Sequence, residues 1–363
     1  MTAGNADEPL LVVGAGPTGL AAALELARLG RPVRVIDRNP ERSRLSKAIG
    51  VNPRTLELME EAGVTERLLA AGRRLHAANL RSRGRLLARI DLGRLPHRYN
   101  FMLALVQSET ERILEERALE LGVVVERLCE AQALEQQEDR VVCTVTCPDG
   151  DRQIAAPHLI GADGAHSTVR HALGLAYDGH TYPFDWQIVD VRLDGPFAED
   201  ELHLLLGADT LLLIVSPGPD VFRLASNGPD PVALLPPGAR VREEIWRSSF
   251  RISYRQVARY QEGRVFLAGD AAHVHSPLGA RGMNLGIEDA TLLARRIVAG
   301  TPEGYGAERH PVARRVIRQT HALTRMATAR APLARWLRDH ILPHLLRNAG
   351  IQQQLARRIA GLA

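Results

Sequence analysis

The feature that most constrains the fold of this chain is a glycine-rich turn close to its N-terminus. The hexapeptide Gly14–Gly19 (GAGPTG) follows the short apolar segment Leu10–Val13, and apolar residues at helical spacing continue from it to Gly30. A second apolar segment, Val33–Ile36, then ends at Asp37. This order of strand, glycine turn, helix, strand and acid is typical of a dinucleotide-binding βαβ unit. The sequence therefore predicts an α/β fold that begins with a Rossmann-like unit.

Each glycine of the turn has a separate physical reason in such a unit. Gly14 makes the tight turn, Gly16 lets the backbone approach a pyrophosphate, and Gly19 allows the helix to pack closely on the strand. The helix that follows presents free N–H groups and the positive end of its dipole, which together bind phosphate. Asp37 is expected to accept hydrogen bonds from ribose hydroxyls. The turn alone does not distinguish FAD from NAD.

Composition argues against several other classes of protein. Aromatic residues make up 4% of the 363 residues, too few for the stacking surfaces that bind single-stranded nucleic acid. No apolar run approaches the ~20 residues of a membrane-spanning helix, and the acidic segment Met1–Glu8 lacks the pattern of a secretion signal. Three cysteines, an odd number, fit a reducing compartment. We therefore expect a cytoplasmic protein without a transmembrane segment or a nucleic-acid partner, as a monomer or a dimer.

The basic residues are almost all arginine, because Lys47 is the only lysine in a chain of net charge +4. Arginine is concentrated beyond Glu308, where it would suit nucleic acid or an anionic membrane. Apolar residues of the same segment recur at helical spacing, so we predict that they pack against the protein while the arginines face solvent. These apolar residues are Val316, Leu323, Met326, Leu333, Trp336, Leu337 and Ile341.

Two further segments follow apolar strands as the first turn does. Leu159–Gly161 leads into the sequence GADGAHSTVR of residues 161–170. Val265–Ala268 leads into GDAAHVHSPLGARGMNLG of residues 269–286, and a long helix is predicted from Met283 to Val298. Three spaced segments in this order are far more specific than any one of them.

Together the three segments resemble those of single-component FAD-dependent aromatic hydroxylases. This group-A flavin monooxygenase family includes p-hydroxybenzoate hydroxylase and the bacterial polyketide hydroxylases. The resemblance covers residues 10–299 and implies a Rossmann-like FAD-binding domain of the GR2 type, an inserted mixed β-sheet substrate domain and C-terminal helices. The FAD-binding domain with these helices would comprise residues 1–75, 100–175 and 257–363, and the substrate domain residues 76–99 and 176–256.

The resemblance also implies roles at the cofactor. It places Asp270 at the ribityl chain, Gln107 at the ribityl or diphosphate region, and the helix that starts at Gly282 at the N1–O2 edge of the flavin, where a helix N-terminus stabilises negative charge. The carbonyl of Pro277 lies near the reactive C4a carbon in this family, so Pro277 is the expected catalytic residue. The expected cofactor-binding residues are Gly14, Gly16, Pro17, Thr18, Gly19, Asp37, Arg38, Lys47, Ala48, Gln107, Asp163, Gly164, Gly269, Asp270, Gly282, Met283 and Asn284.

Some of these residues also have purely structural interpretations. Asp163 and Gly164 match the second family motif, implicated in FAD and NADPH binding, but alone they read as a surface turn before a helix N-cap at His166 or Ser167. Lys47 matches a family loop beside the flavin, yet long charged side chains are mostly solvated.

No metal site is predicted. Cys143 and Cys147 have CxxxC spacing without a further Cys or His pair, which favours a structural role. His273 is expected to orient the loop in which it lies, and His275 to be an ordinary loop residue.

The expected function follows from the resemblance and from one absence in the sequence. No second GxGxxG fingerprint is present, so NAD(P)H is expected to meet the flavin transiently and reduce it by hydride transfer. In this family the reduced flavin captures O₂ as a C4a-hydroperoxide, which hydroxylates an electron-rich ring. We therefore expect an NAD(P)H-dependent FAD monooxygenase acting on a phenolic or polyketide-like small molecule. Candidate substrate contacts are His203, Arg223, Tyr182 and Tyr254, with a strand arginine such as Arg223 more often an exposed rim residue; no general base is assigned.

Two other activities occur on the same fold. A flavin-dependent halogenase needs an essential lysine and a Trp-x-Trp-x-Ile-Pro segment, whereas Trp186, Trp246 and Trp336 are isolated and the only lysine falls in the flavin loop. The second alternative is an FAD reductase or dehydrogenase that inserts no oxygen. The three segments do not exclude it, because they bind flavin whatever the second substrate is.

Overall fold

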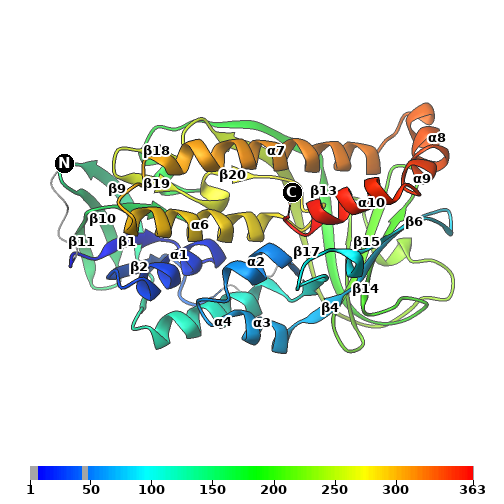
Figure 1. Ribbon diagram of the computed structural model, residues 1–363, viewed down its shortest axis with the longest axis horizontal. Helices are drawn as coiled ribbons and strands as arrows, with labels where there is room; N and C mark the ends of the chain where they lie inside the picture. Colours follow the sequence, from blue (N-terminus) through cyan, green and yellow to red (C-terminus); the bar gives the residue numbers. More distant parts are fainter. Residues whose placement is uncertain (1–6, 43–47, 363) are drawn as a thin grey trace.

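The computed structural model describes residues 7–42 and 48–362, and within them the strands form four sheets. The two largest sheets occupy different halves of an elongated molecule (Figure 1). A sheet of six strands lies in the half that contains the N-terminal end, and a sheet of eight strands lies in the other half.

The six-stranded sheet contains the βαβ unit that the glycine turn predicts. Strands β1 (Leu10–Val13) and β2 (Val33–Asp37) are parallel and are joined by helix α1 (Pro17–Arg28). All of β1 is buried, because a parallel strand is covered on both faces. The other strands are β8 (Val125–Arg127), β12 (Leu159–Gly161), β18 (Gln261–Glu262) and β19 (Val265–Leu267). The order is β18-β19-β12-β1-β2-β8, with β18 antiparallel to β19 and the other pairs parallel.

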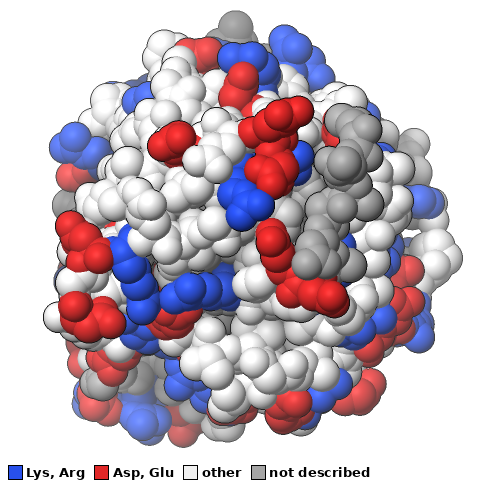
Figure 2. Space-filling model, turned by 90° about the vertical axis from the view of Figure 1, so that its left-hand side faces the viewer, with Lys and Arg blue, Asp and Glu red and all other residues white. Residues whose placement is uncertain are grey.

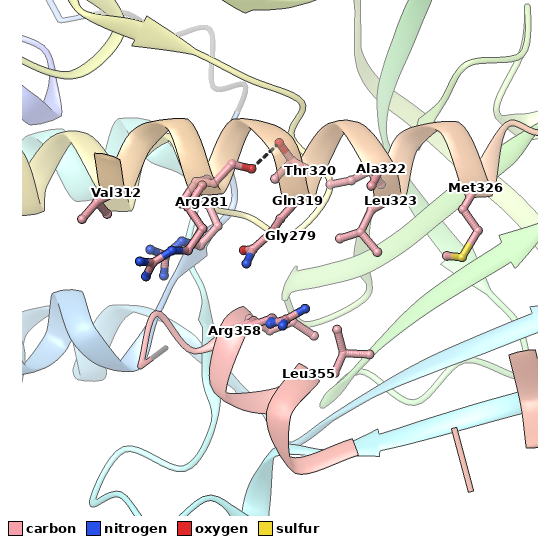
Figure 3. A pocket seen from close by; sticks show the side chains of 14 residues that line it. Gly279, Arg281, Val312, Gln319, Thr320, Ala322, Leu323, Met326, Leu355 and Arg358 are labelled. Atoms are coloured by element: carbon pink, nitrogen blue, oxygen red, sulfur yellow. Dashed lines mark hydrogen bonds between the residues drawn. The ribbon is translucent and has the colours of Figure 1, made fainter. Parts of the chain in front are cut away.

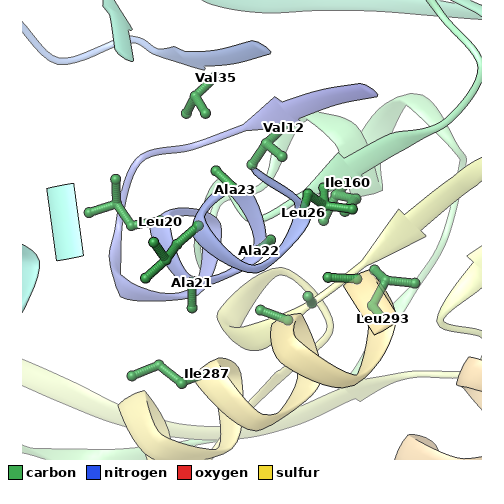
Figure 4. Close-up of a cluster of buried hydrophobic side chains, with 14 of the residues drawn as sticks. Val12, Leu20, Ala21, Ala22, Ala23, Leu26, Val35, Ile160, Ile287 and Leu293 are labelled. Atoms are coloured by element: carbon green, nitrogen blue, oxygen red, sulfur yellow. The ribbon is translucent and has the colours of Figure 1, made fainter. Parts of the chain in front are cut away.

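Helices cover this sheet with apolar faces. The buried side chains of α1 belong to one core with those of β1 and helix α6 (Gly282–Val298), and Figure 4 shows α1 between Val12 of β1 and Leu293 of α6. Helix α4 (Gln107–Glu120) also packs against α1. The shorter helical elements are α2 (Pro53–Leu58), α3 (Thr65–Ala71), α5 (Thr168–Ala172), and the 3₁₀ turns η1 (Leu92–Arg94), η2 (Val232–Leu234) and η3 (Gly269–Ala271).

The eight-stranded sheet is mixed, as the family resemblance implies for the inserted sheet. Strand β14 pairs in parallel with β5, and the remaining neighbours are antiparallel. The order is β20-β17-β13-β16-β15-β14-β5-β6. The strands are β5 (Ala77–Ser82), β6 (Arg85–Asp91), β13 (Tyr177–Asp194), β14 (Glu201–Leu206), β15 (Leu211–Gly218), β16 (Val221–Ser226), β17 (Arg240–Val257) and β20 (His273–Val274).

Two small sheets complete the fold. One joins β3 (Gly50–Val51), β7 (Met102–Ala104) and β4 (Arg73–Leu75). The other is an antiparallel meander of β9 (Glu130–Gln136), β10 (Val141–Cys147) and β11 (Gly150–Ala156). Figure 2 views this end of the molecule and shows basic and acidic side chains next to one another; Arg140 and Asp139 form one such ion pair, at 2.7 Å.

The meander changes the interpretation of the cysteines. Cys129 and Cys147 form a disulfide, whereas Cys143 is free and buried. A disulfide does not agree with the reducing compartment that the odd number of cysteines suggests. The pairing is not visible in the spacing, because it depends on the antiparallel register that places Thr146 opposite Glu130 and so brings their neighbours together.

The C-terminal helices are α7 (Gly304–Ala327), α8 (Pro332–His340), α9 (Leu342–Leu345) and α10 (Ala349–Ile359). Val316 on α7 is buried as predicted, but the prediction is wrong for Leu333, Trp336, Leu337 and Ile341, which are exposed. The reason is that α8 is anchored by a buried arginine: Arg338 donates to the carbonyls of Ala327 (3.1 Å) and Gly207 (2.9 Å). None of the described helices combines the length and apolar character that crossing a membrane requires.

Candidate functional site

Three turns meet because three neighbouring parallel strands end at one edge of the six-stranded sheet. Strand β1 leads into Gly14–Gly19, β12 into Asp163-Gly164, and β19 into Gly269-Asp270. Ligands of such sheets bind at the carboxyl ends of the strands, beside helix N-termini. The structure thus gathers the three sequence segments at the edge where a cofactor is expected.

A cavity of about 190 Å³ lies beside the first two turns. Gly16 is the N-cap of α1, and no described atom lies within 4 Å of the place where its Cβ would be. The N–H groups at the start of α1 therefore border open space, as phosphate binding requires. The lining residues that the sequence predicts are Gly14, Gly16, Asp37, Arg38, Asp163 and Gly164.

The other two glycines of the first turn are required by close approach. Gly14 has φ +103°, and a Cβ on it would lie 2.5 Å from the carbonyl oxygen of Ala162. A Cβ on Gly19 would collide with the carbonyl of Gly14. Both contacts keep the turn tight between β1, β12 and α1.

The carboxylate of Asp37 closes the first turn. Its Oδ2 accepts the backbone N–H of Ala15 at 2.7 Å, and its Oδ1 accepts the backbone and side-chain N–H groups of Asn39 at 2.8 and 2.9 Å. Arg127 lies 3.8 Å away. Asp37 thus orients the turn while it also lines the cavity.

The second turn is held by a helix cap. Ser167 is the N-cap of α5, accepting the N–H of Arg170 at 2.9 Å and donating to Oδ1 of Asp163 at 2.5 Å. Asp163 Oδ2 accepts the N–H of Val169 at 3.1 Å. Burial raises the pKa of Asp163 above its ordinary value, although these hydrogen bonds act in the opposite direction. The structural interpretation, a cap at Ser167, is therefore correct, and Asp163 lines the cavity as well.

Arg170 joins the second turn to the third. Its Nη1 donates to the carbonyl of Ala271 at 3.2 Å, and its Nη2 donates to the carbonyl of Ala165 at 2.9 Å. Its guanidinium lies 4.1 Å above the ring of Tyr177, whose hydroxyl donates to the carbonyl of Asp270 at 2.8 Å. The backbone at Asp270 is thereby fixed while its side chain stays exposed. The sequence motif contains Arg170, but its distant partner Ala271 gives no signal along the chain.

Thr18 joins the first turn to the third. Gly269 has φ +59°, and a Cβ on it would collide with Oγ1 of Thr18. A Cβ on Gly286 would meet the same oxygen. Thr18 is therefore enclosed by two glycines that lie far from it in the sequence.

A buried ionic cluster holds the segment between η3 and α6. His273 Nε2 and Arg309 Nε each lie 2.5 Å from an oxygen of Asp289, and Arg309 Nη2 lies 3.2 Å from Glu288, which in turn faces Arg281 at 3.5 Å. Burial alone would raise the pKa of Asp289, but the positive charge of Arg309 and the contact with His273 lower it below its ordinary value. His273 thus orients its loop, as expected, through a partner on α6 that sequence reasoning missed.

Helix α6 begins at Gly282, close to the predicted start. Among the described residues no side chain caps its first turn, and no described atom lies within 4 Å of a Cβ position on Gly282. Asn284 is used inside the protein: its Oδ1 accepts the N–H of Asn52 at 2.9 Å, and its Nδ2 donates to the carbonyls of Gly50 (2.8 Å) and Ala280 (2.7 Å). Asn284 therefore ties α6 to β3, and Met283 beside it is half-buried.

Pro277 lies in an exposed turn ahead of α6. Its carbonyl accepts the N–H of Ala280 at 2.9 Å. Gly279 (φ +105°) and Ala280 (φ +51°) both have left-handed backbone, which is what brings the chain round to the start of the helix.

Ala48 and Gln107 lie together. The backbone N–H of Gln107 donates to the carbonyl of Ala48 at 3.1 Å, and Gln107 Nε2 donates to Glu111 at 2.8 Å. Burial raises the pKa of Glu111, although this hydrogen bond lowers it. The expectation for Lys47 falls outside the described residues.

Arg223 lies in the eight-stranded sheet and points toward the backbone of Ala48. It is buried and pairs across β13 and β16 with Asp190, to which its Nε and Nη2 donate at 2.7 Å, and its Nη1 lies 3.5 Å from the carbonyl of Ala48. Trp246 on β17 lies opposite Asp190 in the sheet, and the centre of its ring is 5.7 Å from the guanidinium carbon of Arg223. The expectation that a strand arginine is an exposed rim residue is therefore wrong, because Asp190 compensates its charge.

The other substrate candidates lie elsewhere in the sheet. Tyr182 donates or accepts a hydrogen bond with His321 Nδ1 at 2.6 Å, and the ring of Tyr254 lies 4.4 Å from that of His321. His203 is buried with Nε2 3.1 Å from the carbonyl of Ala198, and burial lowers its pKa. Tyr182 and Tyr254 thus share one partner on α7, whereas His203 contacts its own strand connection.

Comparison with known proteins gives the family. Residues 7–220 and 234–320 match the model of a family described as FAD binding domain. The chain belongs to the FAD binding domain family. The expected cofactor, FAD, agrees with this membership.

Two monooxygenases are similar to this protein over most of the chain. The 6-methylpretetramide 4-monooxygenase of Streptomyces rimosus is 39% identical over 358 residues, which cover 91% of this chain and 64% of that protein. The pentachlorophenol 4-monooxygenase of Sphingobium chlorophenolicum is 34% identical and matches 88% of this chain and 65% of that protein. The chain thus spans slightly less than two thirds of the length of these relatives.

A solved structure confirms the fold class. The anhydrotetracycline hydroxylase OxyS from Streptomyces rimosus superposes with a TM-score of 0.82 at 30% identity, over 98% of this chain and 76% of that chain. The family match and the two similar monooxygenases together confirm the predicted resemblance to group-A flavin monooxygenases.

The residues of the site fit FAD on physical grounds. A dinucleotide needs a glycine turn at a helix N-terminus for its pyrophosphate, and the start of α1 borders open space at Gly16. The flavin ring gains negative charge on reduction, and the uncapped start of α6 at Gly282 also borders open space. Both requirements are met at the same edge of the sheet.

Proposed function

We propose that this chain is an FAD-dependent monooxygenase that uses NAD(P)H and O₂ to hydroxylate an aromatic small molecule. The observation that carries the proposal is the meeting of three turns around the open N-termini of α1 and α6. The reaction type is supported by the names of the relatives, 6-methylpretetramide 4-monooxygenase and pentachlorophenol 4-monooxygenase.

We assign the parts of FAD to residues of the three turns. Gly16 and the start of α1 would bind the pyrophosphate, Asp37 and Arg38 the adenosine ribose, and Asp270 the ribityl chain. The start of α6 at Gly282 would face the N1–O2 edge. When bound, FAD would supply the redox chemistry: its ring would accept hydride from NAD(P)H, and the reduced ring would react with O₂.

The remaining assignments concern the flavin ring. Lys47 and Ala48 would lie on one side of it, with Gln107 near the ribityl or diphosphate region and the carbonyl of Pro277 next to the reacting carbon. Asp163 and Gly164 would contact FAD beside the first turn. These roles rest on motif positions, and the contacts described above support those of Ala48, Gln107 and Asp163.

We also propose the division of labour between the sheets. Residues 1–75, 100–175 and 257–363 would form the FAD-binding domain with the C-terminal helices, and residues 76–99 and 176–256 the substrate domain. Support comes from the single sheet that joins β5 and β6 to β13–β17. This sheet would exclude water from the reacting ring, and the buried row that contains Arg223 would face the substrate. A cytoplasmic location and the monomer or dimer state stay predictions.

One set of experiments tests the cofactor. The purified chain should be yellow and release FAD on denaturation, and a colourless preparation that takes up no added FAD would contradict the proposal. Asp270→Asn should weaken FAD retention at least about tenfold, because it removes a charged acceptor. The matched control is Asp178→Asn, since Asp178 is also exposed but lies on β13.

A second experiment separates oxygenation from plain oxidoreduction. Phenols and polycyclic aromatic compounds are screened for stimulated NAD(P)H oxidation under ¹⁸O₂. Incorporation of ¹⁸O into an organic product supports the monooxygenase. Label that appears only in H₂O₂ or water, with every compound that stimulates oxidation, favours the reductase or dehydrogenase.

A further inference from the structure

A second cavity, of about 270 Å³, lies between α7, α10 and the loop Leu278–Arg281. Figure 3 shows side chains of α7 pointing toward α10 across it, with Arg358 and Leu355 on the opposite wall. Its volume is close to the lower end of the range of about 300–1,000 Å³ that small-molecule sites occupy. The volume of the cavity therefore suits a compact ligand of one or two rings.

The walls of this cavity are mainly apolar. One stripe of α7 faces it with Val312, Val316, Leu323 and Met326, whose spacings of four, seven and three residues put them on one side of the helix. Leu355 on α10 faces them. Several of these side chains are only half-buried, so a ligand would remove apolar surface from water on binding.

The polar part of the lining carries one sign of charge. It includes the guanidinium groups of Arg281, Arg315 and Arg358 and no carboxylate. Among the described residues, neither Arg315 nor Arg358 forms an ion pair, so no carboxylate of the described protein neutralises them. An apolar cavity with unneutralised cations at its opening attracts an anionic ligand.

Arg281 supplies the buried end of this charge. The residue is 7% exposed, and its Nη2 lies 3.5 Å from Glu288. Its Nη1 is buried without a hydrogen-bond partner among the described atoms. This nitrogen packs beside Gly361, which does not line the cavity, so Arg281 acts on the cavity through its positive charge.

We propose that this cavity binds a small molecule with an aromatic or other apolar body and one anionic group, a carboxylate, phenolate or enolate, held by Arg281, Arg315 and Arg358. The inference goes beyond the proposed function because it concerns binding, whether the ligand is the compound that is hydroxylated or a second, unreacted molecule. The cavity adjoins the proposed reaction site, since Leu278 directly follows Pro277 and Thr324 of α7 donates to Ser276 at 2.7 Å.

The test uses the FAD-loaded protein and a matched pair of probes, 2-naphthoate and the neutral 2-naphthamide, with binding measured by calorimetry. We expect 2-naphthoate to bind at least about tenfold more tightly than the amide, because only the carboxylate can form charge-assisted hydrogen bonds with the guanidinium groups. Equal affinity for the two probes, or no binding of 2-naphthoate, would overturn the proposal.

The chain offers neighbouring arginines as controls. The double variant Arg315→Gln/Arg358→Gln should weaken 2-naphthoate binding at least about tenfold and leave the amide unchanged. The double variant Arg314→Gln/Arg357→Gln removes the same charge from exposed positions outside the cavity and should stay within about twofold of the parent. Equal weakening in both double variants would show a general charge effect and overturn the site.

A third variant keeps the test independent of charge. Leu323→Trp fills the cavity from α7 and should abolish binding of both probes. Unchanged binding in this variant would place the probe elsewhere.

Product analysis with NAD(P)H and O₂ then distinguishes the two kinds of ligand. Hydroxylated naphthoate identifies the substrate, and bound but unreacted naphthoate identifies an effector. Both results support the binding site, and calorimetry reports it even if no compound is ever hydroxylated.

Discussion

Thr18 occupies the space that a side chain on Gly269 would need, although the two residues belong to the first and the third turn. The contact fixes the distance between the start of α1 and the end of β19. Gly269 also has φ +59°, a backbone conformation that costs other residues energy.

Gly269→Ala should therefore lower both stability and FAD affinity. Gly300→Ala is the matched control, because Gly300 has φ +70° and no described atom within 4 Å of its Cβ position. The control should cost about 1–2 kcal/mol from backbone strain alone. Gly269→Ala should cost more, lower FAD affinity at least about tenfold, and recover part of the loss when combined with Thr18→Ala. Equal effects of the two glycine variants would contradict the contact.

The buried cluster around Asp289 should stabilise the fold. Asp289→Asn leaves Arg309 without its closest partner and should lower the free energy of unfolding by about 3–5 kcal/mol. Glu308→Gln breaks the exposed pair with Arg296 and should cost less than about 1 kcal/mol. Denaturant titrations of the two variants check the difference.

The same carboxylate predicts a pH dependence. The pKa of Asp289 in the folded chain lies below its ordinary value of 3.8, so its contribution to stability is complete above that value and is lost as the pH falls through the folded pKa. The parent protein should lose stability below about pH 4 more steeply than Asp289→Asn. Parallel curves for the two proteins, measured from pH 7 to pH 3, would show that Asp289 is not the group that titrates.

Arg223 and Asp190 should behave as a coupled pair. Arg223→Met alone leaves a partly buried carboxylate unpaired and should destabilise by about 3–5 kcal/mol, whereas Arg223→Met/Asp190→Leu should recover most of that loss. A double-mutant cycle in denaturant measures the coupling. Additive effects would indicate that the two side chains do not interact in solution.

Thiol reactivity tests the arrangement of the cysteines. Burial raises the pKa of Cys143 to about 12, so the native protein should show no fast reaction with an aromatic disulfide reagent at neutral pH. In denaturant one thiol per chain should react without a reductant, and three after reduction, because Cys129 and Cys147 are paired. Three reactive thiols in unreduced, denatured protein would disprove the pair.

The local patterns of the sequence are sufficient for much of the fold. Gly14–Gly19 predicts its turn because glycine spacing, the apolar strand before it and the helix after it all lie within one short segment. Helix α6 is predicted for the same reason, since its periodicity is local. The family resemblance extends these predictions to FAD.

Contacts between distant segments could not be predicted in this way. The partner of His273 is Asp289, the partner of Arg223 is Asp190, and Cys129 pairs with Cys147, in each case through strand order or helix packing. The exposed stripe of α8 is the clearest failure. Its apolar spacing indicates a buried face, but Arg338 anchors the helix from the other side.

The sequence by itself determined the three turns, the strands that lead into them and the cofactor that their family resemblance indicates. Each of these features is encoded by neighbouring residues. Only the tertiary structure decided that β19, β12 and β1 lie side by side, and that Thr18, Arg170 and Tyr177 connect their turns. It also decided which arginines are neutralised and which face a cavity. The physical reason is that charge compensation and close packing depend on distances in space, which residue spacing along the chain does not contain.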